Sequence, residues 1–150
     1  MVARELHVRY RDRPDLPQLD GRQALQGPGD AMRFLRGLLQ PEPVEVMVAV
    51  MLTVKFRPIC FHEIGRGSLS TVIADPRDVF KAALLANAGG VIVSHNHPSG
   101  DPAPSPEDLA ITRRLAAAGS LLSITLVDHI VIGSDDRYFS FSESGLLSGF

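Results

Sequence analysis

The feature that most constrains the fold is the run "VEVMVAVMLTVKF", residues 44–56. One face of an extended chain here would carry the alternating residues Val44, Val46, Val48, Val50, Leu52 and Val54. The opposite face, with Met47, Ala49 and Met51, is nearly as apolar. A strand that is apolar on both faces is typical of the middle of a sheet that helices cover on both sides. The run is too short to span a bilayer as a helix, so it predicts a buried strand.

The remaining elements are predicted from periodicity and from start and stop signals. Strands are expected at residues 5–10 ("ELHVRY"), 58–64 ("PICFHEI"), 71–74 ("TVIA"), 91–95 ("VIVSH"), 123–133 ("SITLVDHIVIG") and 136–141 ("DRYFSF"). Helices are expected at 31–40, capped by Asp30 and stopped by Pro41, after Asp75, and at 105–119. This order predicts a single α/β domain with a mixed β-sheet flanked by helices.

The chain is expected to consist of an N-terminal extension and one domain. Residues 1–42 predict an N-terminal strand, a turn-rich loop and one helix packed on the domain, whereas residues 43–150 form the domain itself. The chain has 150 residues, which is enough for one core.

Composition excludes several classes of function. Cys60 is the single cysteine, which excludes an internal disulfide and a multi-cysteine zinc site. The net charge is -2, so nothing in the composition indicates a strongly basic nucleic-acid binder. Whether the protein binds nucleic acid is left open by the composition. The first ten residues contain no apolar signal-peptide core. We therefore expect a cytoplasmic protein without a membrane partner.

The stretch "SHNHPSGDPAPSPED", residues 94–108, carries the chemistry. His95 and His97 are two residues apart at the end of a predicted buried strand, so both imidazoles should point to the same face. Two neutral imidazoles can share a divalent metal. The proline-rich loop that follows has little conformational freedom and can hold the next helix against the end of the strand.

Asp108 is the best third ligand in the sequence, because it lies in the first turn of that helix. His95, His97 and Asp108 would leave a fourth tetrahedral position for water, as in catalytic zinc sites. The pattern Ser-x-x-Asp has a simpler interpretation, in which Ser105 caps the helix and Asp108 interacts favourably with its dipole. The two interpretations of Ser105 are compatible.

These residues resemble a known family. The spacing His-x-His, seven residues, Ser, two residues, Asp is that of the JAMM (MPN+) metalloprotease family, and His95, His97, Ser105 and Asp108 match it. The segments "ADPRDVFKAALLANAGGVIVSHNHPSG", "ITRRLAAAGSLL" and "VDHIVIG" resemble the bacterial RadC-like branch, over about residues 43 to 143. That branch has a deaminase-like α/β (JAB/MPN) fold. Its members commonly add an N-terminal helix-hairpin-helix region, which residues 1–42 do not resemble.

The resemblance implies roles for particular residues. His95, His97 and Asp108 would bind Zn2+, Ser105 would stabilise an oxyanion, and Glu63 in "HEIGRGSL" would be the general base. Partners for the metal-bound imidazoles are expected among Asp101, Asn96 and either Asp128 or His129, of which only one should face the site.

Two classes of function remain from the sequence. The first is a zinc-dependent hydrolase of the JAMM type, a metallopeptidase or isopeptidase acting on a peptide or protein. The second is a non-hydrolytic RadC-like binding module in an assembly linked to DNA repair or mobile elements. A zinc nucleobase deaminase is excluded, because that chemistry needs His-x-Glu and Pro-Cys-x-x-Cys, whereas residue 97 is His and Cys60 stands alone. The sequence assigns no oligomeric state.

Overall fold

The structure is a computed structural model and describes residues 2–67 and 74–149. The helices are α1 (Pro28–Leu39), α2 (Pro76–Leu85) and α3 (Pro106–Leu122). The strands are β1 (Val46–Leu52), β2 (Pro58–Arg66), β3 (Gly90–Asn96), β4 (Thr125–Ile132) and β5 (Tyr138–Ser140). In the described residues the strands form a five-stranded sheet in the order β2-β1-β3-β4-β5, in which only β3 and β4 run parallel.

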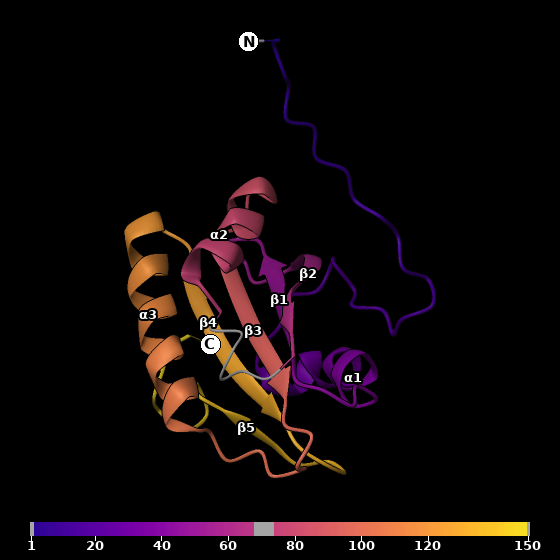
Figure 1. The fold of residues 1–150 in the computed structure, drawn as a ribbon, viewed down its shortest axis with the longest axis vertical. Coiled ribbons are helices and arrows are strands. Elements are labelled where there is room, and N and C mark those ends of the chain that lie inside the picture. Colours follow the sequence, from indigo (N-terminus) through magenta and orange to yellow (C-terminus); the bar gives the residue numbers. More distant parts are fainter. Residues whose placement is uncertain (1, 68–73, 150) are drawn as a thin grey trace.

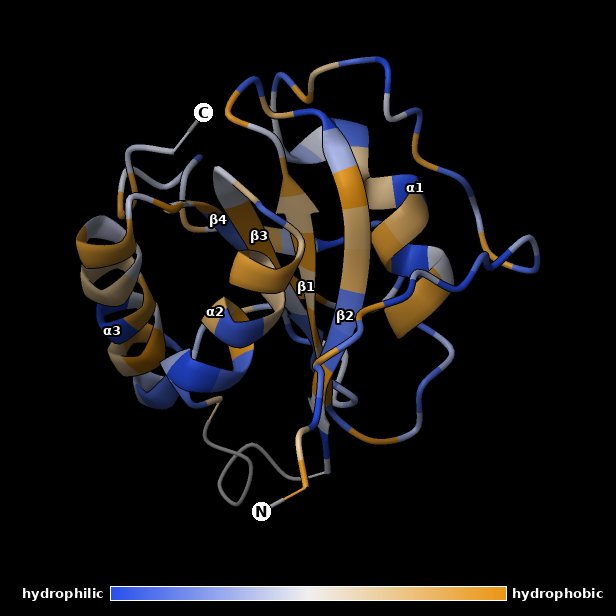
Figure 2. Cartoon of the chain, turned by 90° about the horizontal axis from the view of Figure 1, so that it is seen from above, coloured by the Kyte–Doolittle hydropathy of each residue, from blue (hydrophilic) through white to orange (hydrophobic). Residues whose placement is uncertain are grey.

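The sheet lies between two layers of helix, with α1 on one face and α2 and α3 on the other (Figures 1 and 2). All seven residues of β1 are buried, as its two apolar faces predict. Val46, Val48 and Val50 pack in the cluster of α1, and Met47, Ala49 and Met51 pack in the cluster of α2 and α3. Burying such a side chain contributes about 1.5–3 kcal/mol, so both faces of β1 stabilise the domain. The mixed α/β sandwich is confirmed.

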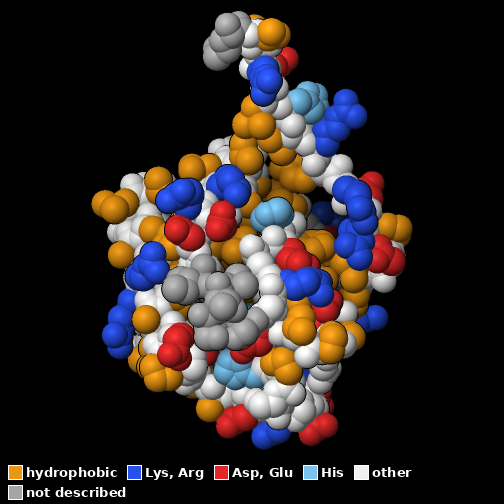
Figure 3. Space-filling view, viewed as in Figure 1, with side chains coloured by type: hydrophobic (Ala, Val, Ile, Leu, Met, Phe, Trp, Pro, Cys, Tyr) orange, Lys and Arg blue, Asp and Glu red, His pale blue; other side chains and the backbone are white. Residues whose placement is uncertain are grey.

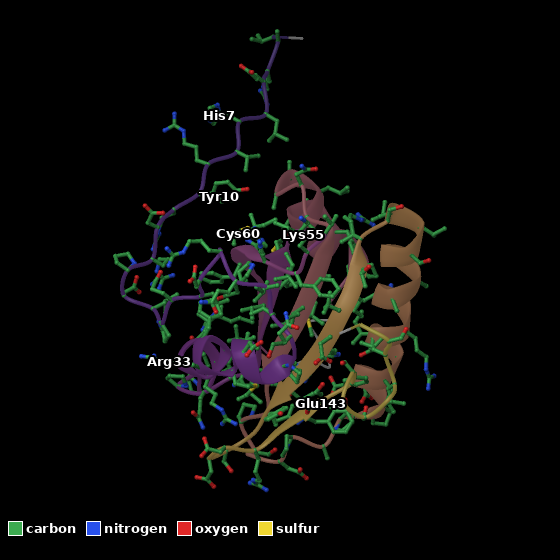
Figure 4. All side chains as sticks on the ribbon, turned by 180° about the vertical axis from the view of Figure 1, so that it is seen from behind. His7, Tyr10, Arg33, Lys55, Cys60 and Glu143 are labelled. Carbon is green, nitrogen blue, oxygen red and sulfur yellow. The ribbon has the colours of Figure 1, made fainter. Side chains whose placement is uncertain are left out.

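The strand predicted at residues 5–10 is not formed. Residues 2–12 are exposed and contain no regular secondary structure. The first part of this N-terminal arm runs away from the body of the domain, and residues 8–12 line a groove beside β2 (Figures 1 and 3). His7 and Tyr10 are labelled on the arm in Figure 4. Residues 5–10 do alternate apolar and polar side chains, but a strand also needs a hydrogen-bonded neighbour, which the arm lacks in the described residues.

Deleting residues 1–12 is therefore expected to leave the melting temperature within about 2 °C of the full chain, because surface changes of this kind usually alter stability by less than about 0.5 kcal/mol. Thermal unfolding followed by circular dichroism checks this. A fall of 8 °C or more would show that the arm packs on the domain.

Two helix boundaries differ from the prediction for local reasons. Asp30 is not the N-cap of α1: the helix begins at Pro28 after Gly27, and the Asp30 carboxylate accepts a hydrogen bond from the Gln26 backbone N–H (2.7 Å). α3 continues past Gly119, whose missing side chain allows close approach, since a Cβ there would lie 2.3 Å from the Ile124 carbonyl oxygen.

Other predictions of local structure are confirmed. Asp75 caps α2 by accepting from the Arg77 backbone N–H, and α1 ends at Leu39, before Pro41. The segment 71–74 was predicted to be extended, but residues 71–73 lie outside the described residues. Among the helices of the described residues, none combines the length and apolarity needed to cross a bilayer.

Candidate metal centre

His95 and His97 lie at the end of β3, where the strand leaves the core. β3 is buried at every residue, and His95 follows Val91 and Val93 on the face that α2 and α3 cover. The His97 backbone N–H donates to the Ile132 carbonyl (2.9 Å), so pairing with β4 continues through the second histidine. The His95 side chain is fully buried and that of His97 is 12% exposed. Any ligand must therefore reach the pair from the side of His97.

The capping box at the start of α3 places the Asp108 carboxylate beside the two imidazoles. Ser105 is the N-cap: its hydroxyl accepts from the Asp108 backbone N–H (3.1 Å), and its own backbone N–H donates to Asp108 Oδ2 (2.8 Å). This capping box fixes the rotamer of the carboxylate and turns it inward, where it is only 1% exposed. The interpretation of Ser105 as a cap is confirmed, and the same hydrogen bonds aim Asp108 at the histidines.

The three predicted ligands converge on one small space. His95 Nε2 lies 3.1 Å from His97 Nε2 and 3.1 Å from Asp108 Oδ1, and His97 Nε2 lies 3.3 Å from Asp108 Oδ2. Zinc–ligand bonds of 2.0–2.2 Å in a tetrahedron separate neighbouring ligand atoms by about 3.3 Å. The donor types and these short separations suit a divalent metal, with Asp108 offering a different carboxylate oxygen to each histidine.

The protonation of His97 supports the same conclusion. His97 Nδ1 lies 2.7 Å from the Asp101 carbonyl oxygen, which can only accept, so the proton of a neutral His97 is on Nδ1 and the lone pair on Nε2. The hydrogen bond with Asp108 raises the pKa of His97. Burial raises the pKa of Asp108, but hydrogen bonds from His95 and His97 outweigh this and hold it well below its usual range. The cluster thus attracts positive charge.

The loop between His97 and Ser105 is held by hydrogen bonds within itself and to Ser134 and Arg137. The Gly100 backbone N–H donates to the His97 carbonyl and the Gly100 carbonyl accepts from Ser134 N–H, both at 2.9 Å. Gly100 has φ +85°, and a Cβ there would lie 2.9 Å from Ser134 Oγ, so glycine is required. The Arg137 guanidinium also donates to the Gly100 carbonyl (3.0 Å). The loop therefore fixes the start of α3 against the end of β3.

A second set of possible ligands overlaps the first. His95, Asp108 and His129 are all buried and offer ligand atoms within 4.8 Å of one another. His129 Nε2, however, lies 2.9 Å from His95 Nδ1, the ring nitrogen that faces away from Asp108. Burial lowers the pKa of His129 well below its usual value. We favour His95, His97 and Asp108 as the ligand set, because Nε2 of both His95 and His97 faces the Asp108 carboxylate, whereas His129 Nε2 faces the other ring nitrogen of His95.

The partners expected around the histidines are only partly found. His129, rather than Asp128, faces the site. Asp128 points to the other side, where it accepts from the Ser140 hydroxyl (2.6 Å), and burial raises its pKa. Asp101 contributes its backbone carbonyl rather than its carboxylate. Asn96 lies on the opposite face and contacts the backbone of Val44 and of Val46 at the start of β1.

Glu63 is not brought to the cluster. On β2 it pairs with Val48, which faces α1, whereas His95 pairs with Met47 on the opposite face of β1. Its side chain is 45% exposed and forms an ion pair with Arg66 (3.0 Å), whose hydrogen bond lowers the pKa of Glu63. The expectation that Glu63 lies beside the metal ligands is wrong in this structure, because its strand presents it to the α1 side.

Glu45 is the carboxylate that the structure places on the histidine side. In the antiparallel register of β1 and β3, Met47 is opposite His95, so the same register continued by two residues sets Glu45 opposite His97. After Asp108 and the Asp101 carbonyl, the charge of Glu45 also raises the pKa of His97. Glu45 is half-buried. The available sequence signal was a lone acid at the start of an otherwise apolar central strand.

Two cavities differ in their relation to the cluster. A cleft of about 270 Å³ includes His97, Pro98 and Gly100 in its wall and opens to solvent. A larger groove of about 960 Å³ runs along β2 between the N-terminal arm and α2. Glu63 lines this groove, but none of His95, His97 and Asp108 does. Of the three proposed ligands, only His97 lines the smaller cleft, whose wall also includes Asn96 from the opposite face of the sheet.

Comparison with known proteins supplies a family. A family model described as "RadC-like JAB domain" matches residues 25–146. A UPF0758 protein of Clostridium beijerinckii is 37% identical over 98% of this chain and 62% of its own length. A UPF0758 protein of Bacillus licheniformis is 45% identical over 84% of this chain and 56% of its own length. A UPF0758 protein of Methanococcoides burtonii is 47% identical over 69% of this chain and 45% of its own length. The chain thus spans about half of the length of these curated relatives.

Proposed function

Because the chain belongs to the family of RadC-like JAB domains, we propose that it is a zinc-dependent hydrolase of peptide or isopeptide bonds. The observation that carries the proposal is the convergence of His95, His97 and Asp108 within 3.1–3.3 Å, beside a carboxylate on the same face. The family implies the metal, and the donor set fits it. Two imidazoles and one carboxylate form a set of ligands typical of catalytic zinc.

His95, His97 and Asp108 would hold the ion. When bound, zinc supplies Lewis-acid chemistry: it polarises a carbonyl and lowers the pKa of water to about 7. The chain itself keeps the ligands in place before the ion arrives, through the capping box on Asp108 and the Asp101 carbonyl on His97. Such preorganisation lowers the entropic cost of assembling the site.

Glu45 is the proposed general base. It faces His97 across the β1–β3 pair, close enough to influence the charge of that imidazole, and a carboxylate so placed can take a proton from attacking water. The Gly67 backbone N–H donates to the Glu45 carbonyl (2.8 Å), which helps to fix this residue at the start of β1. The same proton would then be delivered to the departing amine.

Ser105 is the proposed donor to the oxyanion. Its hydroxyl oxygen accepts from the Asp108 backbone, which leaves the hydroxyl proton available to donate. A donor aimed at the charge that develops in the transition state typically contributes 10²–10³ in rate. Because Ser105 is also the cap of α3, its hydroxyl oxygen is held in place relative to Asp108.

The substrate class follows from the reaction type. We propose a peptide or protein chain as the substrate, because the proposed reaction is hydrolysis of peptide or isopeptide bonds and His97 is the ligand that reaches the surface. The competing proposal, a binding module that holds a metal without hydrolysis, shares every ligand and differs only in the outcome of an activity test.

The test is to load the protein with one equivalent of zinc and incubate it with a library of peptides and lysine-isopeptide conjugates. Mass spectrometry should detect cleavage that a chelator abolishes and added zinc restores. Tight binding of zinc without any cleavage would favour the binding module. Failure to bind zinc at all would contradict the metal centre itself.

A further inference from the structure

Behind the proposed ligands lies a ring of hydrogen bonds formed entirely by buried groups. Thr112 Oγ1 lies 2.6 Å from the Asp108 carbonyl oxygen and 2.6 Å from His129 Nδ1. His129 Nε2 lies 2.9 Å from His95 Nδ1, and His95 Nε2 lies 3.1 Å from Asp108 Oδ1. The ring therefore begins and ends on Asp108. The exposed fraction of Thr112 is 3% and that of His95 and His129 is zero, so water does not compete for these bonds.

The direction of each hydrogen bond follows from the first. A carbonyl oxygen only accepts, so the Thr112 hydroxyl donates its single proton to Asp108. Towards His129 the hydroxyl must then accept, which places the His129 proton on Nδ1 and leaves a lone pair on Nε2. That lone pair accepts from His95, so the His95 proton is on Nδ1. The lone pair of a neutral His95 is therefore on Nε2, which faces Asp108 and His97. Its hydrogen bond to Asp108 needs a second proton on Nε2, and a metal would take the place of that proton.

The plane of the His129 ring is also fixed. It stacks on Phe141 with ring centroids 4.9 Å apart and an interplanar angle of 10°. Stacking prevents the imidazole from turning about its Cβ–Cγ bond, so both of its nitrogens keep their partners.

We infer that Thr112 and His129 are positioning residues that set the tautomer of His95 and so present its Nε2 lone pair to a divalent metal. The role in metal binding rests on the proposed function, whereas the tautomers of His95 and His129 are a property of the metal-free chain and can be measured without zinc. Partners of metal-bound histidines typically alter metal affinity 10–100-fold when they are mutated. Here the partner is another histidine, whose orientation a threonine on α3 determines.

The first experiment reads the tautomers directly. Two-bond 1H–15N correlation spectra of the metal-free, 15N-labelled protein distinguish a proton on Nδ1 from one on Nε2. We expect both His95 and His129 to carry it on Nδ1, the form that free histidine disfavours in water. A His95 ring whose Nδ1 carries no proton in the unaltered chain would overturn the inference, whatever the protein does with zinc.

The second experiment measures zinc affinity by competition with a chromophoric chelator. Thr112→Val keeps the shape of the side chain but removes the hydroxyl, and it should weaken zinc binding about 10–100-fold. Thr112→Ser, which keeps the hydroxyl, should bind within about threefold of the unaltered chain. Thr125→Val on the exposed start of β4 is the matched control and should change nothing. Equal affinity in Thr112→Val and the unaltered chain would overturn the inference.

The two experiments separate this inference from the proposed function. If the unaltered chain binds no zinc, the metal centre fails, while the spectra still decide the tautomers. If Thr112→Val does not fold, shown by its melting curve, the spectra of the unaltered chain alone decide. If zinc binds and the tautomers are as expected but no substrate is cleaved, the positioning role stands and the hydrolase does not.

Discussion

Replacing Asp108 with Asn is expected to weaken zinc binding by more than about 100-fold and to leave the domain folded. The substitution removes the one charged ligand of the proposed set, a larger change than the loss of an outer partner, which typically costs 10–100-fold. Asp108 is the N3 residue of the capping box, and the side-chain oxygen of Asn at this position can still accept from the Ser105 backbone N–H. Isothermal titration with zinc and a thermal melt on the same sample measure both effects.

The matched control for Asp108 is its neighbour Glu107, another acid in the first turn of α3. Glu107 is exposed and contributes to the same helix dipole, so Glu107→Gln reports any general loss of negative charge there. Its zinc affinity should stay within about threefold of the unaltered chain, because distant exposed charges are largely screened. Equal affinities in Asp108→Asn and Glu107→Gln would remove Asp108 from the ligand set.

Replacing Glu45 with Gln is expected to slow hydrolysis about 10²–10⁴-fold, the usual contribution of a general base. Zinc content should not change, because Glu45 is not among the three proposed ligands. Initial rates on a substrate from the library screen, together with metal analysis of the purified variant, check the two statements. A variant that loses both zinc and activity would assign Glu45 to the ligands instead.

Glu63→Gln is the discriminating control, because the two carboxylates lie on opposite faces of the sheet. Its rate should stay within about twofold of the unaltered chain, since exposed ion pairs such as Glu63–Arg66 contribute little. Loss of activity in Glu63→Gln with normal activity in Glu45→Gln would restore the role that the family resemblance implies for Glu63.

The misplacement of Glu63 has an identifiable physical cause. β2 contains a bulge, across which the pairing changes from Met47 with Gly65 to Val48 with Glu63. Without the bulge, the first register would pair Glu63 with Ala49, on the side of the histidines. A shift of one residue transfers a side chain to the other face of a sheet. No periodicity in "PICFHEIGR" signals that extra residue.

The N-terminal arm shows that an alternating sequence pattern alone does not make a strand. "ELHVRY" has the alternation of a strand, yet in the described residues it pairs with nothing. Alternation states which side chains would share a face if the segment were extended. It does not supply the neighbouring backbone groups that a strand needs.

The sequence by itself determined the features that depend on near neighbours along the chain. The two apolar faces of β1, the shared face of His95 and His97 and the capping box of Ser105 with Asp108 all follow from spacings of two or three residues. Only the tertiary structure decided which residues meet across strands and layers. Glu45 opposite His97, and His129 behind His95 with Thr112, depend on strand order, register and the packing of α3 on β4, which no local spacing encodes.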